Sequence, residues 1–204
     1  DLRDNVIAKV PVGAADRVHV IPNFVDTAAI EPRDRLTDYR RELGLGDGQV
    51  VLYAGNVGFS QSLDLVVAAA RALPDVTFLI NGDGAARASL EEAARGLTNL
   101  HFAGYLEPSR LGELLATGDV HVVPLRAGLG RVSVPSKTYS IMAAGRPVVA
   151  AIDPGTAVPV ILDASGGGVS VAPDDPEAFI AAVRDLVEHP QVGRRQGALG
   201  RQWV

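Results

Sequence analysis

A chain of 204 residues, 47% of them hydrophobic, is long enough for one well-buried domain or for half of a larger enzyme. The absence of cysteine excludes a disulfide framework and a thiolate metal site, and the four histidines lack ligand spacing, so we expect no metal. A net charge of −5 without a basic stripe argues against nucleic-acid binding, and neither a signal peptide nor the roughly 18–20 apolar residues of a membrane span is found.

The first half of the chain alternates apolar runs with amphipathic segments. The patterns predict a short helix over residues 1–9, a short strand over 17–21 and a helix over 34–43 that stops at Gly44. Strands are expected over 49–54, 76–80 and 100–103, with helices over 61–73 and 85–95 between them. In the PNFVD segment, residues 22–26, we expect Asn23 and Asp26 to serve turn chemistry.

The second half continues the alternation. We expect helices over 108–117, 137–144, 156–163, 176–188 and 194–204, and strands over 119–124, 147–151 and 169–172. Asp174-Asp175-Pro176 should cap a strongly amphipathic helix. About six strands alternating with helices predict an α/β fold, a doubly wound parallel sheet with helices on both faces.

The stretch from Val132 to Ala150 organises the rest of the chain. It reads as an extended loop, a short helix that Ser136 should cap and Gly145 should stop, and a buried strand. Lys137 stands in the first turn of that helix, where an exposed lysine opposes the helix dipole. Its position is easier to understand if an anion binds there, although a solvated lysine is the plain alternative.

A glycine-containing loop, GNVGFSQ over residues 55–61, joins a predicted strand to a predicted helix. Strand, glycine loop and helix N-terminus together form a phosphate-binding geometry, but two glycines also suit any tight turn. Asn56 and Gln61 can donate N–H bonds to phosphate oxygens without bringing charge.

The sequence PSKTYSIMAAGRPVVA, residues 135–150, resembles the signature helix and strand of the retaining glycosyltransferases of family four, which have the GT-B fold. Within that family it resembles the branch of the bacterial colanic-acid and fucosamine transferases. The resemblance runs over essentially the whole chain and matches only the second, donor-binding domain. It implies that residues 1–204 are a single nucleotide-sugar-binding domain, one Rossmann-like half of a GT-B enzyme whose N-terminal acceptor domain is absent.

The resemblance also implies site residues. Common members of the family carry arginine and lysine at the places of Asn56 and Gln61, and two glutamates at the places of Val132 and Ser140, so the catalytic residues stay unassigned here. The residues implied for the diphosphate are Asn56, Gly58, Gln61, Lys137, Arg126 and Arg131. Tyr105 and Leu106 are implied for the base, and Ser133, Val134 and Ser140 for the ribose or the donor sugar.

The implied activity is transfer of a hexosyl or N-acetylhexosaminyl group, with retention, from a nucleoside-diphosphate sugar, UDP-linked by expectation, to a polysaccharide or lipid-linked acceptor. The implied partners are that donor, the acceptor and the N-terminal domain; no cofactor, metal, nucleic acid or membrane span is expected. The fragment alone should be inactive, and a cytoplasmic location, peripheral at the inner face of the membrane, is expected. A nucleotide-sugar epimerase, which would normally need carboxylates for proton transfer, and a non-catalytic nucleotide-binding module are the alternatives.

Overall fold

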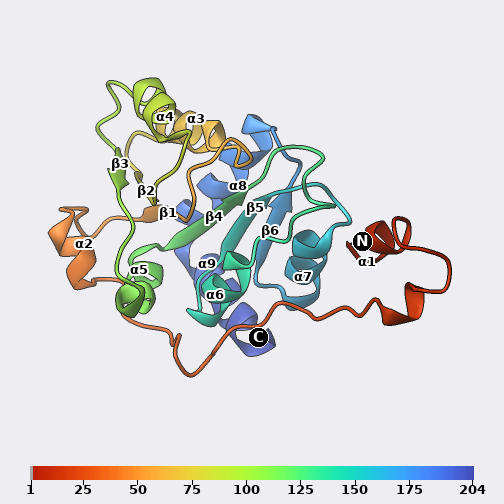
Figure 1. Cartoon of the computed structure of the whole chain (residues 1–204). Helices are drawn as coiled ribbons and strands as arrows, with labels where there is room; N and C mark the ends of the chain where they lie inside the picture. The colour runs from red at the N-terminus through yellow and green to blue at the C-terminus, as the bar shows by residue number, and fades with distance from the viewer. Residues whose placement is uncertain (1) are drawn as a thin grey trace.

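Six short apolar runs form one parallel sheet in the computed structural model, which describes residues 2–204 (Figure 1). The strands are β1 (Val50–Ala54), β2 (Thr77–Asn81), β3 (Leu100–Ala103), β4 (Val120–Pro124), β5 (Val148–Ala151) and β6 (Gly168–Val171). Their order is β3-β2-β1-β4-β5-β6, so the sheet is wound outward in both directions from the seam between β1 and β4. This confirms the doubly wound parallel fold. The central strands are buried on both faces, as their β-branched composition predicts.

Helices cover both faces of the sheet (Figure 1). They are α1 (Leu2–Ile7), α2 (Asp38–Glu42), α3 (Asp64–Ala72), α4 (Arg87–Ala93), α5 (Leu111–Thr117), α6 (Lys137–Ala143), α7 (Ala157–Ser165), α8 (Pro176–Glu188) and α9 (Pro190–Trp203), with 3₁₀ turns at Ala15–Arg17 and Pro108–Arg110. One apolar core joins α3, α4 and α8 to the sheet, and a second joins α5, α6 and α7 to its other face. Within residues 2–204, no helix is both long and apolar enough to cross a membrane.

Two local predictions are wrong. The strand expected over residues 17–21 does not form: a 3₁₀ turn at Ala15–Arg17 leads into extended backbone that pairs with no strand in the described part of the chain. Figure 1 shows this segment passing outside the sheet. Ser136 has helical φ and ψ of −60° and −23°, and within residues 2–204 its hydroxyl accepts no capping bond. Gly145 does adopt the expected left-handed conformation, with φ of 69°.

A buried charge cluster closes the amino end of the seam between β1 and β4. The carboxylate of Asp119, just before β4, accepts hydrogen bonds from the Val50 N–H at 2.9 Å and from Arg40 Nη1 at 3.2 Å, and it also pairs with Arg35. Arg40 is 1% exposed and donates further bonds to the carbonyls of Thr117 and Gly46. The segment that holds both arginines is therefore fastened to the sheet by its charges.

Helix α9 crosses the turn between α6 and β5 at close range. A Cβ atom on Gly197 would overlap the carbonyl oxygen of Gly145, and one on Gly200 would lie 3.2 Å from the Cα of Gly167. These glycines, with Gly193 against Pro147, let the helix backbone rest directly on the turn that ends the central helix.

Removing the Asp119 carboxylate should unfold the protein more easily. Asp119→Ala leaves Arg40 buried without its counter-charge, so we expect the free energy of unfolding to fall by about 3–5 kcal/mol in urea titrations. Asp163→Ala, which removes an exposed carboxylate from α7, is the matched control and should change stability by less than about 0.5 kcal/mol. Equal effects of the two substitutions would contradict the role given to the cluster.

The close approach of α9 makes a second prediction. Gly197→Ala would raise intrinsic helix propensity by about 1 kcal/mol, yet we expect net destabilisation of roughly 1–3 kcal/mol because the methyl group meets a backbone carbonyl. Gly48→Ala, where nothing lies within 4 Å of the new Cβ, serves as the control. A raised melting temperature for Gly197→Ala would show that the helix is not held this closely.

Candidate functional site

The loops that follow β1 and β4 meet at the carboxyl edge of the sheet. The backbone N–H of Arg126 donates to the Ser60 carbonyl at 3.0 Å, and its Nε donates to the Phe59 carbonyl at 2.8 Å. β1 and β4 are neighbours at which the strand order reverses. Doubly wound sheets bind their ligands in the crevice at such a switch point, so these two loops frame the candidate site.

The loop after β1 is held by the loop after β2. The Gly55 N–H donates to the Asn81 carbonyl at 2.9 Å, and the Val57 N–H donates to the Asp83 carbonyl at 2.8 Å. Gly82 has φ of 145°, and a Cβ atom there would overlap the Gly55 carbonyl. Only glycine permits this approach, so the backbone of the first loop is fixed before any ligand arrives.

Three of the predicted diphosphate residues gather in that loop. The Gly58 N–H donates to Gln61 Oε1 at 3.1 Å, and a Cβ atom on Gly58 would lie 2.7 Å from Asn56 Nδ2. The two amide side chains therefore flank Gly58. Because the Gln61 oxygen is already engaged, its amide nitrogen is the group left to donate to a ligand.

Lys137 lies at the same carboxyl edge of the sheet, beside the end of β1. Its Nζ atom stands 3.9 Å from the centroid of the Tyr53 ring, and a Cβ atom on Gly55 would lie 2.6 Å from it. Within residues 2–204 the ammonium has no ion-pair partner, and burial lowers its pKa to about 8. The expectation of an exposed lysine is therefore wrong, because the side chain folds back over an aromatic face and stays only partly accessible.

Tyr53 supports the ammonium as a neutral ring. Its hydroxyl donates to the Asn56 carbonyl at 2.6 Å, and burial raises its pKa well above the usual range. It therefore brings no negative charge to Lys137. The same residue joins the cation to the backbone of the first loop. The sequence did not predict this role for Tyr53, because a tyrosine within an apolar strand is usually a core residue.

Arg126, also predicted for the diphosphate, has its charge paired. Its Nη2 atom lies 3.0 Å from the Asp64 carboxylate at the start of α3, and its Nη1 lies 3.9 Å from Asp174. With its bond to the Phe59 carbonyl, the side chain ties two loops together. A diphosphate would have to compete with Asp64 for this guanidinium, whereas Lys137 has no such competitor in the described chain.

Carboxylates after β5 and β6 hold the loop after β4. Asp153 accepts bonds from the Gly128 and Gly130 N–H groups, both at 2.9 Å, and these bonds lower its pKa. Asp174 accepts from the Ala127 N–H at 3.0 Å and from the Ser62 hydroxyl. Burial acts to raise the pKa of Asp174, but these bonds and the Arg126 charge outweigh it and lower that pKa. Both carboxylates are thus engaged in shaping the loop, a role that sequence alone did not reveal.

The residues predicted for the base follow β3, next to the loop after β2. Tyr105 is 66% exposed, and its hydroxyl donates to the Asp83 carbonyl at 3.0 Å. Leu106 is half-buried against a small apolar cluster. Asn81, 2% exposed at the end of β2, donates its side-chain amide to the Gly104 carbonyl and so fixes the turn that carries both residues. A polar residue ending an apolar strand was the signal that could have marked Asn81.

The remaining predicted residues lie in the segment after β4 and on α6. Arg131 and Val134 line a cavity of about 960 Å³ beside α1 and α7, and neither Asn56, Gln61 nor Lys137 is among the described residues that line it. Ser133 is exposed and its N–H donates to the Leu129 carbonyl at 3.0 Å. Ser140 is half-buried on α6. The role implied for Arg131 at the diphosphate stays a prediction.

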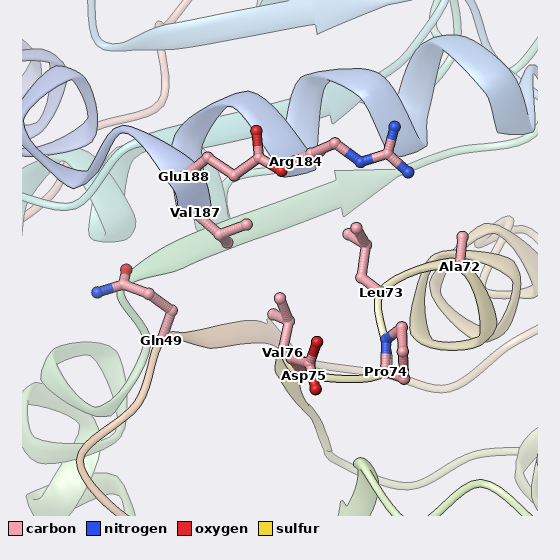
Figure 2. A pocket seen from close by; sticks show the side chains of 9 residues that line it. All are labelled: Gln49, Ala72, Leu73, Pro74, Asp75, Val76, Arg184, Val187 and Glu188. Carbon is pink, nitrogen blue, oxygen red and sulfur yellow. The ribbon is translucent and has the colours of Figure 1, made fainter.

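A smaller cavity, of about 370 Å³, lies at the opposite edge of the sheet (Figure 2). Its walls come from Gln49 before β1, from the turn between α3 and β2, and from α8. Figure 2 shows Arg184, Val187 and Glu188 of α8 along one side of it. Because it faces the amino ends of the strands, it has no part in the candidate site.

Comparison with known families agrees with this geometry. Residues 48–189 match the family model described as glycosyl transferases group 1. The chain belongs to this family. The match begins two residues before β1 and ends one residue after α8, so it includes all six strands and the loops of the candidate site.

Individual relatives extend the likeness over most of the chain. "Putative colanic acid biosynthesis glycosyl transferase WcaI" of Escherichia coli (strain K12) is 34% identical over 192 residues, which are 89% of this chain and 47% of that protein. The sulfoquinovosyl transferase SQD2 of Arabidopsis thaliana is 28% identical over 193 residues, 93% of this chain and 37% of its own. This chain therefore spans less than half the length of these two relatives.

Solved structures share the fold. Anabaena Alr3699/HepE, crystallised in complex with UDP-glucose, superposes with a TM-score of 0.80 at 19% identity, over 98% of this chain and 55% of that one. At this identity the likeness is one of fold: the sheet and its helices correspond to one Rossmann-like half of a GT-B glycosyltransferase.

Proposed function

We propose that this chain forms the donor-binding half of a retaining, family-four glycosyltransferase of the colanic-acid and fucosamine-transferase branch. The proposed donor is a nucleoside-diphosphate sugar, UDP-linked, and the proposed product is a hexosyl or N-acetylhexosaminyl group on a polysaccharide or lipid-linked acceptor. The observation that carries the proposal is the unpaired ammonium of Lys137 at the switch point of the sheet. An uncompensated cation in a partly buried position is what an anionic ligand requires.

The chemistry assigned to these residues is stabilisation of a leaving diphosphate. As the bond from the sugar to the diphosphate breaks, negative charge grows on the diphosphate oxygens. Lys137 would supply a charge, and the amides of Asn56 and Gln61 would supply N–H donors, all held in fixed orientations by the loop contacts. Preorganised donors of this kind are effective because they need no reorganisation during the reaction. No step in this scheme uses a metal or a cofactor.

The two carboxylates that hold the loop after β4 favour a transferase over an epimerase. An epimerase of the same architecture would need a carboxylate free to move protons. Asp153 and Asp174 are each bonded to backbone N–H groups, and the pKa of each is lowered, so both favour the ionised, structural state. The non-catalytic nucleotide-binding module stays as the second candidate, since Val132 and Ser140 stand where the family has glutamates.

The proposed partners follow from the length of the relatives. The acceptor would be bound chiefly by the preceding half of the same enzyme, because this chain spans only 47% of WcaI. A cytoplasmic position at the inner face of the membrane, reached through that half, is part of the proposal.

Replacing Lys137 tests the donor site directly. Calorimetric titration with UDP, GDP and TDP should identify the base, and Lys137→Met should weaken binding of the preferred diphosphate by roughly ten- to a hundredfold, since a charge-assisted bond contributes about 1.5–3 kcal/mol. The melting temperature at pH 7 should stay the same or rise, because the change removes a desolvated charge. Unchanged affinity in Lys137→Met would remove this residue from the site.

The affinity for the diphosphate should depend on pH differently in the wild-type protein and in Lys137→Met. A bound diphosphate raises the pKa of Lys137 from about 8, so binding takes up a proton when the free ammonium is deprotonated. The affinity should therefore fall above about pH 8, approaching tenfold per pH unit, at pH values where the diphosphate itself is fully ionised. Lys137→Met should show a flat profile over this range. A flat wild-type profile would mean that the ammonium does not face the phosphates.

The isolated chain should bind a donor without turning it over. The purified 204 residues, incubated with UDP-sugars and a glycan acceptor, should release no UDP above the buffer rate, whereas a protein of the relatives' full length should. Steady transfer by the fragment would show that the acceptor site lies within this domain.

A further inference from the structure

Tyr53 lies where the core of the protein meets the candidate site. It is 1% exposed in β1, and with Val51 it packs into the apolar core that α3, α4 and α8 share with the sheet. A phenylalanine would fill the same space without a hydroxyl that has to be satisfied on burial. The Tyr53 hydroxyl donates to the Asn56 carbonyl at 2.6 Å, in the loop after β1. The ring therefore belongs to the core, while its polar end belongs to the site.

The face of the Tyr53 ring carries the Lys137 ammonium. The Nζ atom lies 3.9 Å from the ring centroid, well inside the limit of about 6 Å for a cation–π contact. In the described part of the chain, Arg87 and Arg110 also lie over aromatic rings, at 5.9 Å and 5.4 Å, but both arginines form ion pairs with glutamates as well. Lys137 has no ion-pair partner within residues 2–204, so the ring is the group that supports its charge.

A ring supports a cation differently from a carboxylate. A carboxylate beside Lys137 would cancel its charge and compete with an anionic ligand, whereas a neutral ring attracts the ammonium through its quadrupole and leaves the net charge in place. In the described chain, Tyr53 on β1 and His121 on β4 are the titratable side chains that interact with Lys137 from the sheet. Burial lowers the pKa of His121 to about 4 and raises the pKa of Tyr53 well above its usual range, so both are neutral near pH 7. The charge of Lys137 is thus held without being neutralised.

The cation and the loop meet the same ring at Gly55. A Cβ atom on Gly55 would lie 2.6 Å from Lys137 Nζ and 3.7 Å from the Tyr53 hydroxyl oxygen. The next residue, Asn56, accepts the hydrogen bond of that hydroxyl on its carbonyl. Tyr53 therefore contacts the ammonium with its face and the loop with its hydroxyl. One side chain sets the position of a charged donor relative to a loop that carries neutral amide donors.

We propose that Tyr53 is a positioning residue of the donor site: its ring holds the Lys137 ammonium in its charged form, and its hydroxyl fixes the loop of Asn56 beside that charge. The proposal rests on the diphosphate site proposed above. Tyr53 itself touches no phosphate and acts through Lys137 and Asn56. The contribution of the ring to nucleotide affinity should therefore depend on the presence of Lys137, so that the two are not additive.

The role of the ring can be measured without any nucleotide. The chain has two lysines, Lys9 and Lys137, so isotope-labelled lysine gives two side-chain NMR signals, and Lys137→Met identifies them. Tyr53→Phe is compared with a ring-fluorinated phenylalanine at the same position, which has nearly the same shape but an electron-poor face. The titration midpoint of Lys137 should stay close to the parent value in Tyr53→Phe and move to lower pH with the fluorinated ring, because a weaker ring stabilises the ammonium less. The midpoint of Lys9 should be the same in all proteins. Equal Lys137 midpoints for the two rings would overturn the proposal.

UDP binding by the same two ring variants tests whether the ring acts through Lys137. At about pH 9, above the lysine pKa of about 8, the fluorinated ring should weaken UDP binding about threefold or more relative to Tyr53→Phe. At about pH 7, where the ammonium is mostly charged with either ring, the difference should be smaller. With Lys137→Met added, the two rings should bind UDP within about twofold at both pH values. A difference that persists without the lysine would show that the ring acts by another route and would contradict the proposal.

The hydroxyl is tested by Tyr53→Phe against the parent. Loss of the bond to the Asn56 carbonyl should weaken UDP binding about threefold to tenfold, and by the same factor on either side of the lysine titration, since this bond acts on the loop and not on the charge. Equal affinities of Tyr53→Phe and the parent would remove the hydroxyl from the proposal.

Tyr39 supplies the matched control. It is also a buried tyrosine, 5% exposed, beneath a cation, but it lies on α2. Phenylalanine and its fluorinated analogue at Tyr39 should leave UDP affinity and the Lys137 midpoint unchanged. Equal effects at Tyr39 and Tyr53 would indicate a general loosening of the core and overturn the assignment. If the chain bound no nucleotide, the proposed donor function would fail as well; if UDP binding depended on Lys137 but not on the ring, the Tyr53 proposal alone would fail.

Discussion

The seam between β1 and β4 depends on one carboxylate. β1 is in register with β2 over five residue pairs but with β4 over only two, Val51 with Val120 and Leu52 with His121. Asp119 extends this short ladder, because its backbone N–H donates to the Val50 carbonyl at 2.8 Å while its carboxylate accepts from the Val50 N–H. Such a charge is tolerable at 9% exposure only with Arg35 and Arg40 beside it. The switch point that defines the site thus rests on an ion cluster at the other end of the same strands.

At the carboxyl edge the distribution of charge is reversed. Asp153 and Asp174 are occupied by backbone N–H groups of the loop after β4, and Asp64 is occupied by Arg126. Lys137 is left without a counter-charge in the described chain. A protein of net charge −5 therefore presents a locally positive floor where its parallel strands end. The local positive charge arises because the nearby carboxylates of Asp64, Asp153 and Asp174 are already bonded to other groups. The net charge of the sequence does not reveal this.

The fold could be predicted because it depends on local patterns: β-branched runs such as residues 50–54 and 148–151 leave few alternatives to buried parallel strands. The strand predicted over residues 17–21 does not form. The apolar residues Val18 and Val20, two positions apart, are compatible with a strand, but this pattern does not show whether a neighbouring strand is available to pair with it. In the sequence, Arg126 and Lys137 are both basic and both follow predicted strands, and the place of Lys137 in the first turn of a helix made it the stronger candidate. Only the tertiary contacts, with Asp64 for one and the Tyr53 ring for the other, distinguish a paired cation from an unpaired one. The roles assigned to Asn56, Gln61 and Tyr105 stay predictions.

The first loop carries the neutral amides Asn56 and Gln61 where common members of the family carry arginine and lysine, and a lysine on α6 supplies a positive charge beside it. With Asn56 and Gln61 neutral, a cation without an ion-pair partner in residues 2–204 is supplied by Lys137, which reaches the loop from another helix, over Tyr53 and past Gly55. The arrangement constrains all three positions together, since a side chain at Gly55 would occupy the space of the ammonium and loss of the Tyr53 ring would remove its support. It also changes the character of the site. An arginine stays charged at every physiological pH, whereas a lysine whose pKa is about 8 loses its charge as the pH rises above that value, unless a bound anion raises the pKa.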